Sequence, residues 1–164
     1  MRILGIDPGT IAMGYGVIDE EGGEITQVAC GALTAPCETP MAQRLHSLYT
    51  SLLGIIERYG PDEAAIEEPF VAKNARSALA VGQAIGVATV AVTQSGIPVH
   101  HYTPTQVKQA VTSYGRSGKG QVQEMVGILL GLSAPPQPAD AADALAVAIC
   151  HIQGRQISKL LAER

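Results

Sequence analysis

Apolar positions follow strand spacing at the start of the chain and helix spacing afterwards. Apolar runs separated by turns at Pro8–Gly9 and Glu20–Gly23 predict three antiparallel strands within residues 2–33. Apolar residues three to four positions apart then predict an amphipathic helix that begins at Thr39–Pro40 and ends at Gly60–Pro61. The first part of the chain is therefore a predicted three-stranded meander followed by a helix.

Strands and helices alternate in the rest of the chain. Residues 64–67 and 97–102 each predict a short strand, and a helix over about 75–93 separates them. Further helices are predicted to begin near Thr103, Val122 and Ala139. Because helical crossovers join them, the two later strands are expected to lie parallel to the first. The predicted fold class is α/β, a five-stranded mixed sheet flanked by helices, with residues 1–164 forming a single domain.

The helix predicted over residues 75–93 has unusually small side chains. Ala and Gly recur along it, at Ala78, Ala80, Gly82, Ala84, Gly86 and Ala88. A helix that is apolar on most faces packs on two sides, so we expect one side against the sheet and the other against a second copy of the chain. Its apolar core of about 16 residues, with Gln83 in the middle, is shorter than a membrane span requires.

The composition is that of a globular cytoplasmic protein. Apolar residues make up 46% of the 164 positions and charged residues 16%, which excludes a disordered chain. Cys30, Cys37 and Cys150 match neither a disulfide framework nor a zinc motif, so reduced thiols are expected. Asp7 follows the N-terminus too closely to leave room for the apolar segment of a signal peptide. We therefore expect a cytoplasmic location and no membrane partner.

Charge is distributed unevenly along the chain. The net charge is −4, but residues 69–123 contain five cations and no acid, so the remaining residues carry −9. The five cations are Lys73, Arg76, Lys108, Arg116 and Lys119. Such segregation is typical of a phosphate-binding face on an otherwise acidic protein. Sparse charge on a mostly buried segment would give the same count.

Two carboxylates end neighbouring strands of the predicted sheet. Asp7 ends the first strand beside a glycine-rich turn that leaves room for a bulky group, and Glu67 ends the strand over 64–67. Because these strands are expected to be adjacent and parallel, both acids lie at one edge. An Asp that only caps its turn would fit Asp7 equally well. Glu68 is expected to point to the opposite face from Glu67.

Asp140 and Asp143 open the last predicted helix. They lie three residues apart on one helix face, where the helix dipole alone would favour them. Together with Asp7 and Glu67 they would repel one another unless a cation lies among them, and all-oxygen ligands suit Mg²⁺ or Mn²⁺. Two such ions about 3.5–4 Å apart are the usual arrangement for phosphodiester hydrolysis. With the basic segment, these acids predict cleavage of a nucleic-acid backbone.

Five motifs in chain order resemble the RuvC family of bacterial Holliday-junction resolvases. They are Ile6-Asp7-Pro8-Gly9-Thr10 with Gly14-Tyr15-Gly16, Ile66-Glu67-Glu68 with Phe70 and Ala72-Lys73-Asn74, Gln106-Val107-Lys108-Gln109-Ala110-Val111, Lys119 with Gln121-Val122-Gln123, and Asp140-Ala141-Ala142-Asp143-Ala144-Leu145-Ala146. The resemblance covers about residues 2–152, and the tail over 153–164 lies outside it. A single such motif would be weak, whereas five in the same order are specific.

The resemblance implies an RNase H-like fold and a homodimer that nicks two opposed strands of a four-way DNA junction during recombination and repair. It implies two Mg²⁺ ions per subunit, replaceable by Mn²⁺, with ligands Asp7, Glu67, Asp140 and Asp143, and Lys119 beside them at the catalytic centre. It implies DNA contacts from Phe70, Lys73, Asn74, Arg76, Lys108, Arg116 and Lys119, with Phe70 stacking on unpaired bases. The branch-migration proteins RuvA and RuvB are implied as partners, and the small-sided helix as the dimer contact.

Other interpretations stay open at this stage. A junction-binding protein that does not cleave, or another RNase H-like nuclease acting on hybrids or ordinary duplex, would share most of these motifs. An ATPase of the actin and sugar-kinase type also begins with an Asp-x-Gly-Thr turn, but it needs two such domains, which 164 residues cannot hold. Phe70 would also serve as a core aromatic residue, and Arg76 as a solvated surface residue.

The histidines are expected to lie outside the catalytic centre. His100 and His101 end a predicted strand, where polar edge residues are commoner than metal ligands. His151 follows Asp143 by eight residues, roughly two helical turns, which is too far to share its metal.

Overall fold

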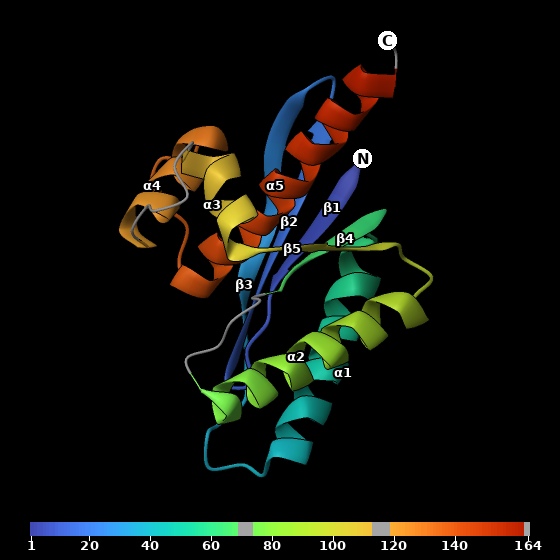
Figure 1. Cartoon of the computed structure of the whole chain (residues 1–164), viewed down its shortest axis with the longest axis vertical. Coiled ribbons are helices and arrows are strands. Elements are labelled where there is room, and N and C mark those ends of the chain that lie inside the picture. The colour runs from blue at the N-terminus through green and yellow to red at the C-terminus, as the bar shows by residue number, and fades with distance from the viewer. Residues whose placement is uncertain (69–73, 113–118, 163–164) are drawn as a thin grey trace.

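Five strands form one mixed sheet in the computed structural model, which describes residues 1–68, 74–112 and 119–162 (Figure 1). In the order β3-β2-β1-β4-β5, they are β1 (Arg2–Asp7), β2 (Ala12–Glu21), β3 (Glu24–Thr34), β4 (Glu63–Glu67) and β5 (Val99–Tyr102). β2 is antiparallel to β1 and β3, whereas β4 is parallel to β1 and β5. The predicted mixed sheet is confirmed, including the pairing of the strands that end in Asp7 and Glu67.

Helices cover both faces of this sheet. They are α1 (Met41–Tyr59), α2 (Ala75–Gln94), α3 (Pro104–Thr112), α4 (Lys119–Leu129) and α5 (Ala139–Ala162). α1 and α2 lie on one face, and α5 lies on the other with α3 and α4 beside it (Figure 1). α1 begins one residue later than predicted, because Pro40 takes the N-cap position, and it ends at Gly60 in the left-handed conformation that glycine favours.

Strand alternation divides the core into two layers. Even-numbered residues of β1 and β4 join the core under α1 and α2, namely Leu4, Ile6, Ala64 and Ile66. Odd-numbered residues face α5 instead, and Ile3 and Ala65 belong to the core on that side. The same alternation directs Asp7, Glu63 and Glu67 toward the α5 face, which is the face that carries the chemistry.

Glycines in β1 and β2 let α5 lie unusually close to the sheet. A Cβ on Gly5 would lie 2.0 Å from the backbone oxygen of Ala144, and one on Gly14 would lie 2.0 Å from the backbone oxygen of Asp140. A Cβ on Gly9, in the first turn, would lie 2.1 Å from the backbone oxygen of Ala12, the first residue of β2. Backbone atoms fill the space where these glycines have no Cβ, and the expectation that the turn leaves room for a bulky group stays a prediction.

The small-sided helix α2 buries one side and exposes the other. Ala84, Ala88, Ala91 and Val92 are buried, and the helix packs on α1 and β4. On its open side Leu79 and Val90 are 66% and 55% exposed. By length and composition its 20 residues could cross a membrane, so the expectation that it is too short was wrong. Because core helices of soluble proteins pass the same test, this is weak evidence for a span.

The three cysteines differ in exposure, which predicts the order in which they react. Cys37 is exposed, Cys30 is half-buried and Cys150 is buried in α5. Burial raises the pKa of Cys150 to about 11 and also raises the pKa of Cys30, so their reactive thiolates are scarce at neutral pH. We expect a disulfide reagent to modify Cys37 first and Cys150 only after denaturation, as timed labelling and mass spectrometry would measure. Labelling in urea is the control, and fast modification of Cys150 in the folded protein would contradict its burial in α5.

Candidate active site

Three of the predicted acids line one pocket. Asp7, Glu67 and Asp143 meet there around a volume of about 250 Å³, together with Lys108. The remaining lining residues are apolar, namely Pro104, Val107 and Val122. Because β1 and β4 are parallel and pair Ile6 with Ile66, the next residue of each strand, Asp7 and Glu67, ends at the same level. The sheet edge thus presents two half-buried carboxylates side by side.

The N-terminal end of α5 supplies the other acids. Asp143 reaches the pocket, whereas Asp140, one turn earlier, is half-buried and is not among the residues that line it. The backbone of Asp140 lies against Gly14 of β2. This close contact fixes the distance between the start of α5 and the sheet. The structure therefore brings together three of the four predicted metal ligands in one pocket and places the fourth on the adjoining turn.

Lys108 reaches the same pocket from α3. That helix starts with a capping box, in which the Thr103 backbone N–H donates to Gln106 Oε1 at 2.8 Å and the Gln106 backbone N–H donates to Thr103 Oγ1 at 3.2 Å. Val107 and Val111 are buried in the core shared with α5, which fixes the side of α3 that faces the acids. Lys108 is half-buried and is the cation among the pocket's lining residues.

The other predicted DNA contacts are described only in part. Asn74 is the N-cap of α2, where its Oδ1 accepts a hydrogen bond from the Ser77 backbone N–H at 2.9 Å, and Arg76 is exposed in the first turn of that helix. Lys119 is the first residue of α4, and its side chain lies outside the described part of the structure. Phe70, Lys73 and Arg116 also lie outside the described residues.

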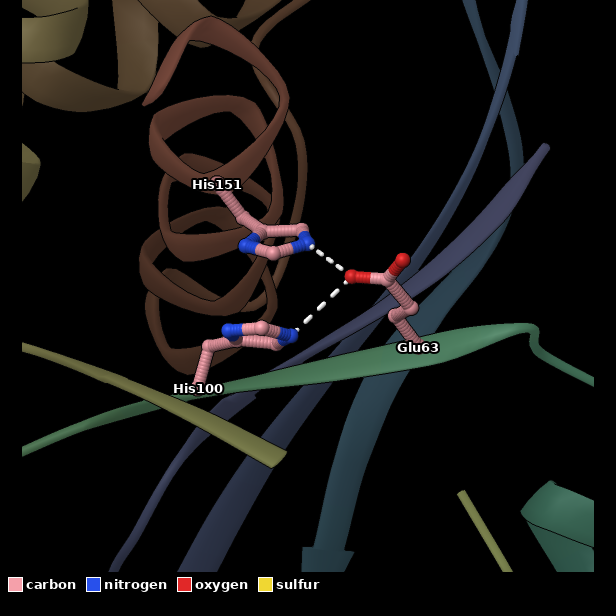
Figure 2. Close-up of side chains that lie close together, drawn as sticks. All are labelled: Glu63, His100 and His151. Carbon is pink, nitrogen blue, oxygen red and sulfur yellow. Dashed lines mark hydrogen bonds and ion pairs between the residues drawn. The ribbon is translucent and has the colours of Figure 1, made fainter. Parts of the chain in front are cut away.

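A second cluster of titratable groups was missed from the sequence. Glu63, His100 and His151 meet between β4, β5 and α5 (Figure 2). The strand register could have indicated part of it: His100 pairs with Ala65, two residues beyond Glu63, so both side chains share the α5 face. His101 points the other way, and its Nδ1 lies 3.0 Å from the carboxylate of Glu68. The prediction that Glu68 leaves the face of Glu67 agrees with this pairing.

Electrostatics in this cluster favour a charged acid beside a neutral imidazole. Burial raises the pKa of Glu63, but the hydrogen bond with His151 and the nearby Arg155, His151 and His100 outweigh it, so the pKa ends below its ordinary value. Burial lowers the pKa of His151 by more than its hydrogen bond to Glu63 raises it. The guanidinium of Arg155, bound to Glu63 Oε1, therefore supplies the balancing positive charge.

Comparison with known proteins gives a consistent result over the whole chain. Residues 3–151 match the family described as "Crossover junction endodeoxyribonuclease RuvC". The proteins of that name from Chloroflexus aggregans and Dehalococcoides mccartyi are 58% and 48% identical to this chain over 151 and 163 residues. The first alignment covers 92% of each chain, and the second covers 99% of this chain and 98% of the relative.

Solved structures agree with these relatives. The structure of Thermus thermophilus RuvC in complex with a Holliday junction substrate superposes with a TM-score of 0.90 at 33% identity and covers 96% of each chain. The yeast mitochondrial resolvase Ydc2, at 14% identity and a TM-score of 0.65, shares the fold. The predicted RNase H-like fold is confirmed. The chain belongs to the RuvC family of crossover junction endodeoxyribonucleases.

Proposed function

We propose that this protein resolves Holliday junctions by nicking two opposed DNA strands during recombination and repair. The observation that carries the proposal is the pocket in which Asp7, Glu67 and Asp143 lie beside Lys108, at the edge of the sheet. Acids beside a lysine suit phosphodiester hydrolysis. The acids can hold metal ions, and the lysine is itself a cation, at the point where negative charge develops on the phosphate. The family name and the junction-bound Thermus thermophilus relative support the choice of substrate.

Two Mg²⁺ ions per subunit, replaceable by Mn²⁺, fit the donor set of this pocket. Carboxylate oxygens from the ends of β1 and β4 and from α5 are hard ligands, and no imidazole or thiolate is among the described residues that line the pocket. We assign Asp7, Glu67, Asp140 and Asp143 as the ligands. When bound, such ions activate the attacking water and stabilise the leaving oxygen.

The chain's own side chains orient the DNA backbone at this site. Lys108 is positioned by α3 to hold a phosphate oxygen as a point charge, and Lys119 is proposed to do the same from the start of α4. The apolar lining residues Val107 and Val122 keep bulk water from one side of the acids. Phe70, Lys73, Asn74, Arg76 and Arg116 enter the proposal as DNA contacts on family resemblance.

A homodimer is the form that would place two such pockets on opposed strands. We propose α2 as its contact, because the exposed Leu79 and Val90 and a groove of about 410 Å³ between α1 and α2 leave an apolar face on this side. The groove is lined by Leu45, His46, Tyr49, Gln83, Gly86, Val87 and Val90. RuvA and RuvB are proposed as partners, and the cytoplasm as the location.

The test is incubation with a synthetic four-way junction and with a matched linear duplex, with Mg²⁺ or with EDTA. Paired nicks at symmetric positions, in the junction only and with metal only, are expected. Junction binding without nicks in Mg²⁺ and Mn²⁺, across several junction sequences, would support a binding protein that does not cleave. Equal cutting of the duplex would support a less selective nuclease of the same fold.

A further inference from the structure

Glu63, His100 and His151 bring three metal-binding groups together at the opposite end of β4 from Glu67. Glu63 Oε2 lies 2.9 Å from His151 Nε2 and 3.0 Å from His100 Nε2, and the ligand atoms of the three residues lie within 4.8 Å of one another. Figure 2 shows a nitrogen of each imidazole ring beside the same carboxylate oxygen. The cluster therefore joins β4, β5 and α5 at one point.

One nitrogen of this cluster lacks a hydrogen bond. His100 Nε2 is buried and makes none within the described part of the chain, although Glu63 Oε2 is only 3.0 Å away. This distance would suit a hydrogen bond, so the angle between the two groups is what prevents one. A buried polar atom without a partner destabilises the folded state, because it has lost its hydrogen bonds to water. A cation placed between this nitrogen and the carboxylate would remove that destabilisation.

The surroundings orient the three groups as ligands are oriented in metal sites. Tyr102 Oη lies 2.8 Å from His151 Nδ1, so it can accept a hydrogen bond from Nδ1–H in the tautomer whose Nε2 lone pair binds a metal. Arg155 binds Glu63 Oε1, which leaves Oε2 for the cluster. His151 is 1% exposed, so the packing around it holds its ring in place beside the carboxylate.

We propose that Glu63, His100 and His151 bind one Zn²⁺ ion. Two imidazoles and one carboxylate are a set that zinc accepts with a fourth position open, whereas Mg²⁺ prefers oxygen ligands alone. In a tetrahedral site with zinc–ligand distances of about 2.0–2.1 Å, two ligand atoms lie about 3.3 Å apart. The observed separations of 2.9 and 3.0 Å need to widen only slightly. A pocket of about 570 Å³ is lined by His100, Tyr102 and His151, among others, so solvent reaches this side of the cluster.

This ion is distinct from those of the carboxylate pocket. Glu63 and Glu67 are four residues apart on β4, which is about 13 Å along a strand. His151 follows Asp143 by eight residues, which is about 12 Å along a helix. Zinc here would tie the four-residue edge strand β5 to β4 and α5. Because it binds the folded chain, it would raise the unfolding temperature by mass action.

The test is titration of the whole protein with Zn²⁺ in excess Mg²⁺, which keeps the carboxylate pocket occupied. We expect one zinc site per chain by calorimetry, a zinc-dependent rise in unfolding temperature, and strong visible absorption when Co²⁺ replaces zinc in a four-coordinate site. His100→Ala is expected to weaken zinc binding at least tenfold and to abolish the rise. His101→Ala is the matched control, because that neighbouring ring points to the other face, and it is expected to leave both unchanged.

Two further variants separate the outcomes. Glu63→Gln removes the carboxylate ligand and is expected to act as His100→Ala does. Asp7→Asn is expected to leave zinc binding intact, because it alters only the carboxylate pocket. Equal zinc affinity in wild type, His100→Ala and Glu63→Gln would overturn the proposal. So would zinc binding lost in Asp7→Asn, or the weak Co²⁺ absorption of a six-coordinate oxygen site in the wild type.

Discussion

Replacing Asp7 by Asn is expected to abolish cleavage of a four-way junction while junction binding persists. Asn keeps the size of the side chain but removes the negative charge from the pocket that Asp7 shares with Glu67 and Asp143. Loss of a residue that merely orients a metal ligand costs about 10–100-fold in activity, so loss of a ligand should exceed a hundredfold. Nicking of a labelled junction in Mg²⁺ measures the first effect, and a gel-shift assay measures the second.

Glu68→Gln is the matched control for this loss. Glu68 neighbours Glu67 in sequence, but it is exposed and pairs with His101 instead of lining the carboxylate pocket. The Glu68→Gln protein should therefore cleave the junction at the wild-type rate. If Asp7→Asn lost junction binding together with cleavage, Asp7 would have a structural role, and its assignment as a metal ligand would fail.

Replacing Gly5 by Ala is expected to destabilise the fold by about 3 kcal/mol, at the upper end of what overpacking usually costs. The new Cβ would lie 2.0 Å from the backbone oxygen of Ala144 and 2.8 Å from the backbone nitrogen of Ala148. These atoms belong to α5, which cannot yield as a flexible side chain would. The unfolding temperature should fall by about 6–12 °C for a domain of this size. Calorimetry measures that shift.

Gly54→Ala is the opposite control. Gly54 is an exposed residue in the interior of α1, and a Cβ there would meet nothing within 4 Å. Because Gly costs about 0.5–1 kcal/mol relative to Ala in a helix, this change should stabilise the protein. A Gly5→Ala protein as stable as the wild type would show that α5 can move away from β1, and that its close packing does not fix the position of Asp143.

The meeting of Asp7 and Glu67 at one edge of the sheet was predictable, because it depends on strand order. Three antiparallel strands followed by a helical crossover make the strand of Glu67 a parallel neighbour of the strand of Asp7, and parallel neighbours end together. The position of Asp143 followed from its place at the start of a helix. Motif order added the family, and with it the substrate. None of this required knowledge of how side chains pack.

The complete histidine cluster was not predictable, because the place of His151 in it depends on packing. Glu63 and His151 are 88 residues apart in sequence, and their contact exists only because α5 lies on the odd-numbered face of β4. Spacing along one helix correctly separated His151 from Asp143, but it said nothing about a partner on another element. The role of Gly14 escaped for the same reason, since the sequence does not show that a glycine within a strand lies against the backbone of a helix.

The position of α5 in the chain has a consequence for synthesis. This helix follows all five strands in sequence, yet it contacts β1, β2 and β4 at the centre of the sheet. A ribosome therefore releases the strands first, and the apolar surface around Ile3 and Ala65 stays uncovered until α5 emerges. During the same interval the pocket contains Asp7 and Glu67 but lacks Asp143, which belongs to α5. A nascent chain thus carries an incomplete nuclease, and nicking activity arises only when the core is closed.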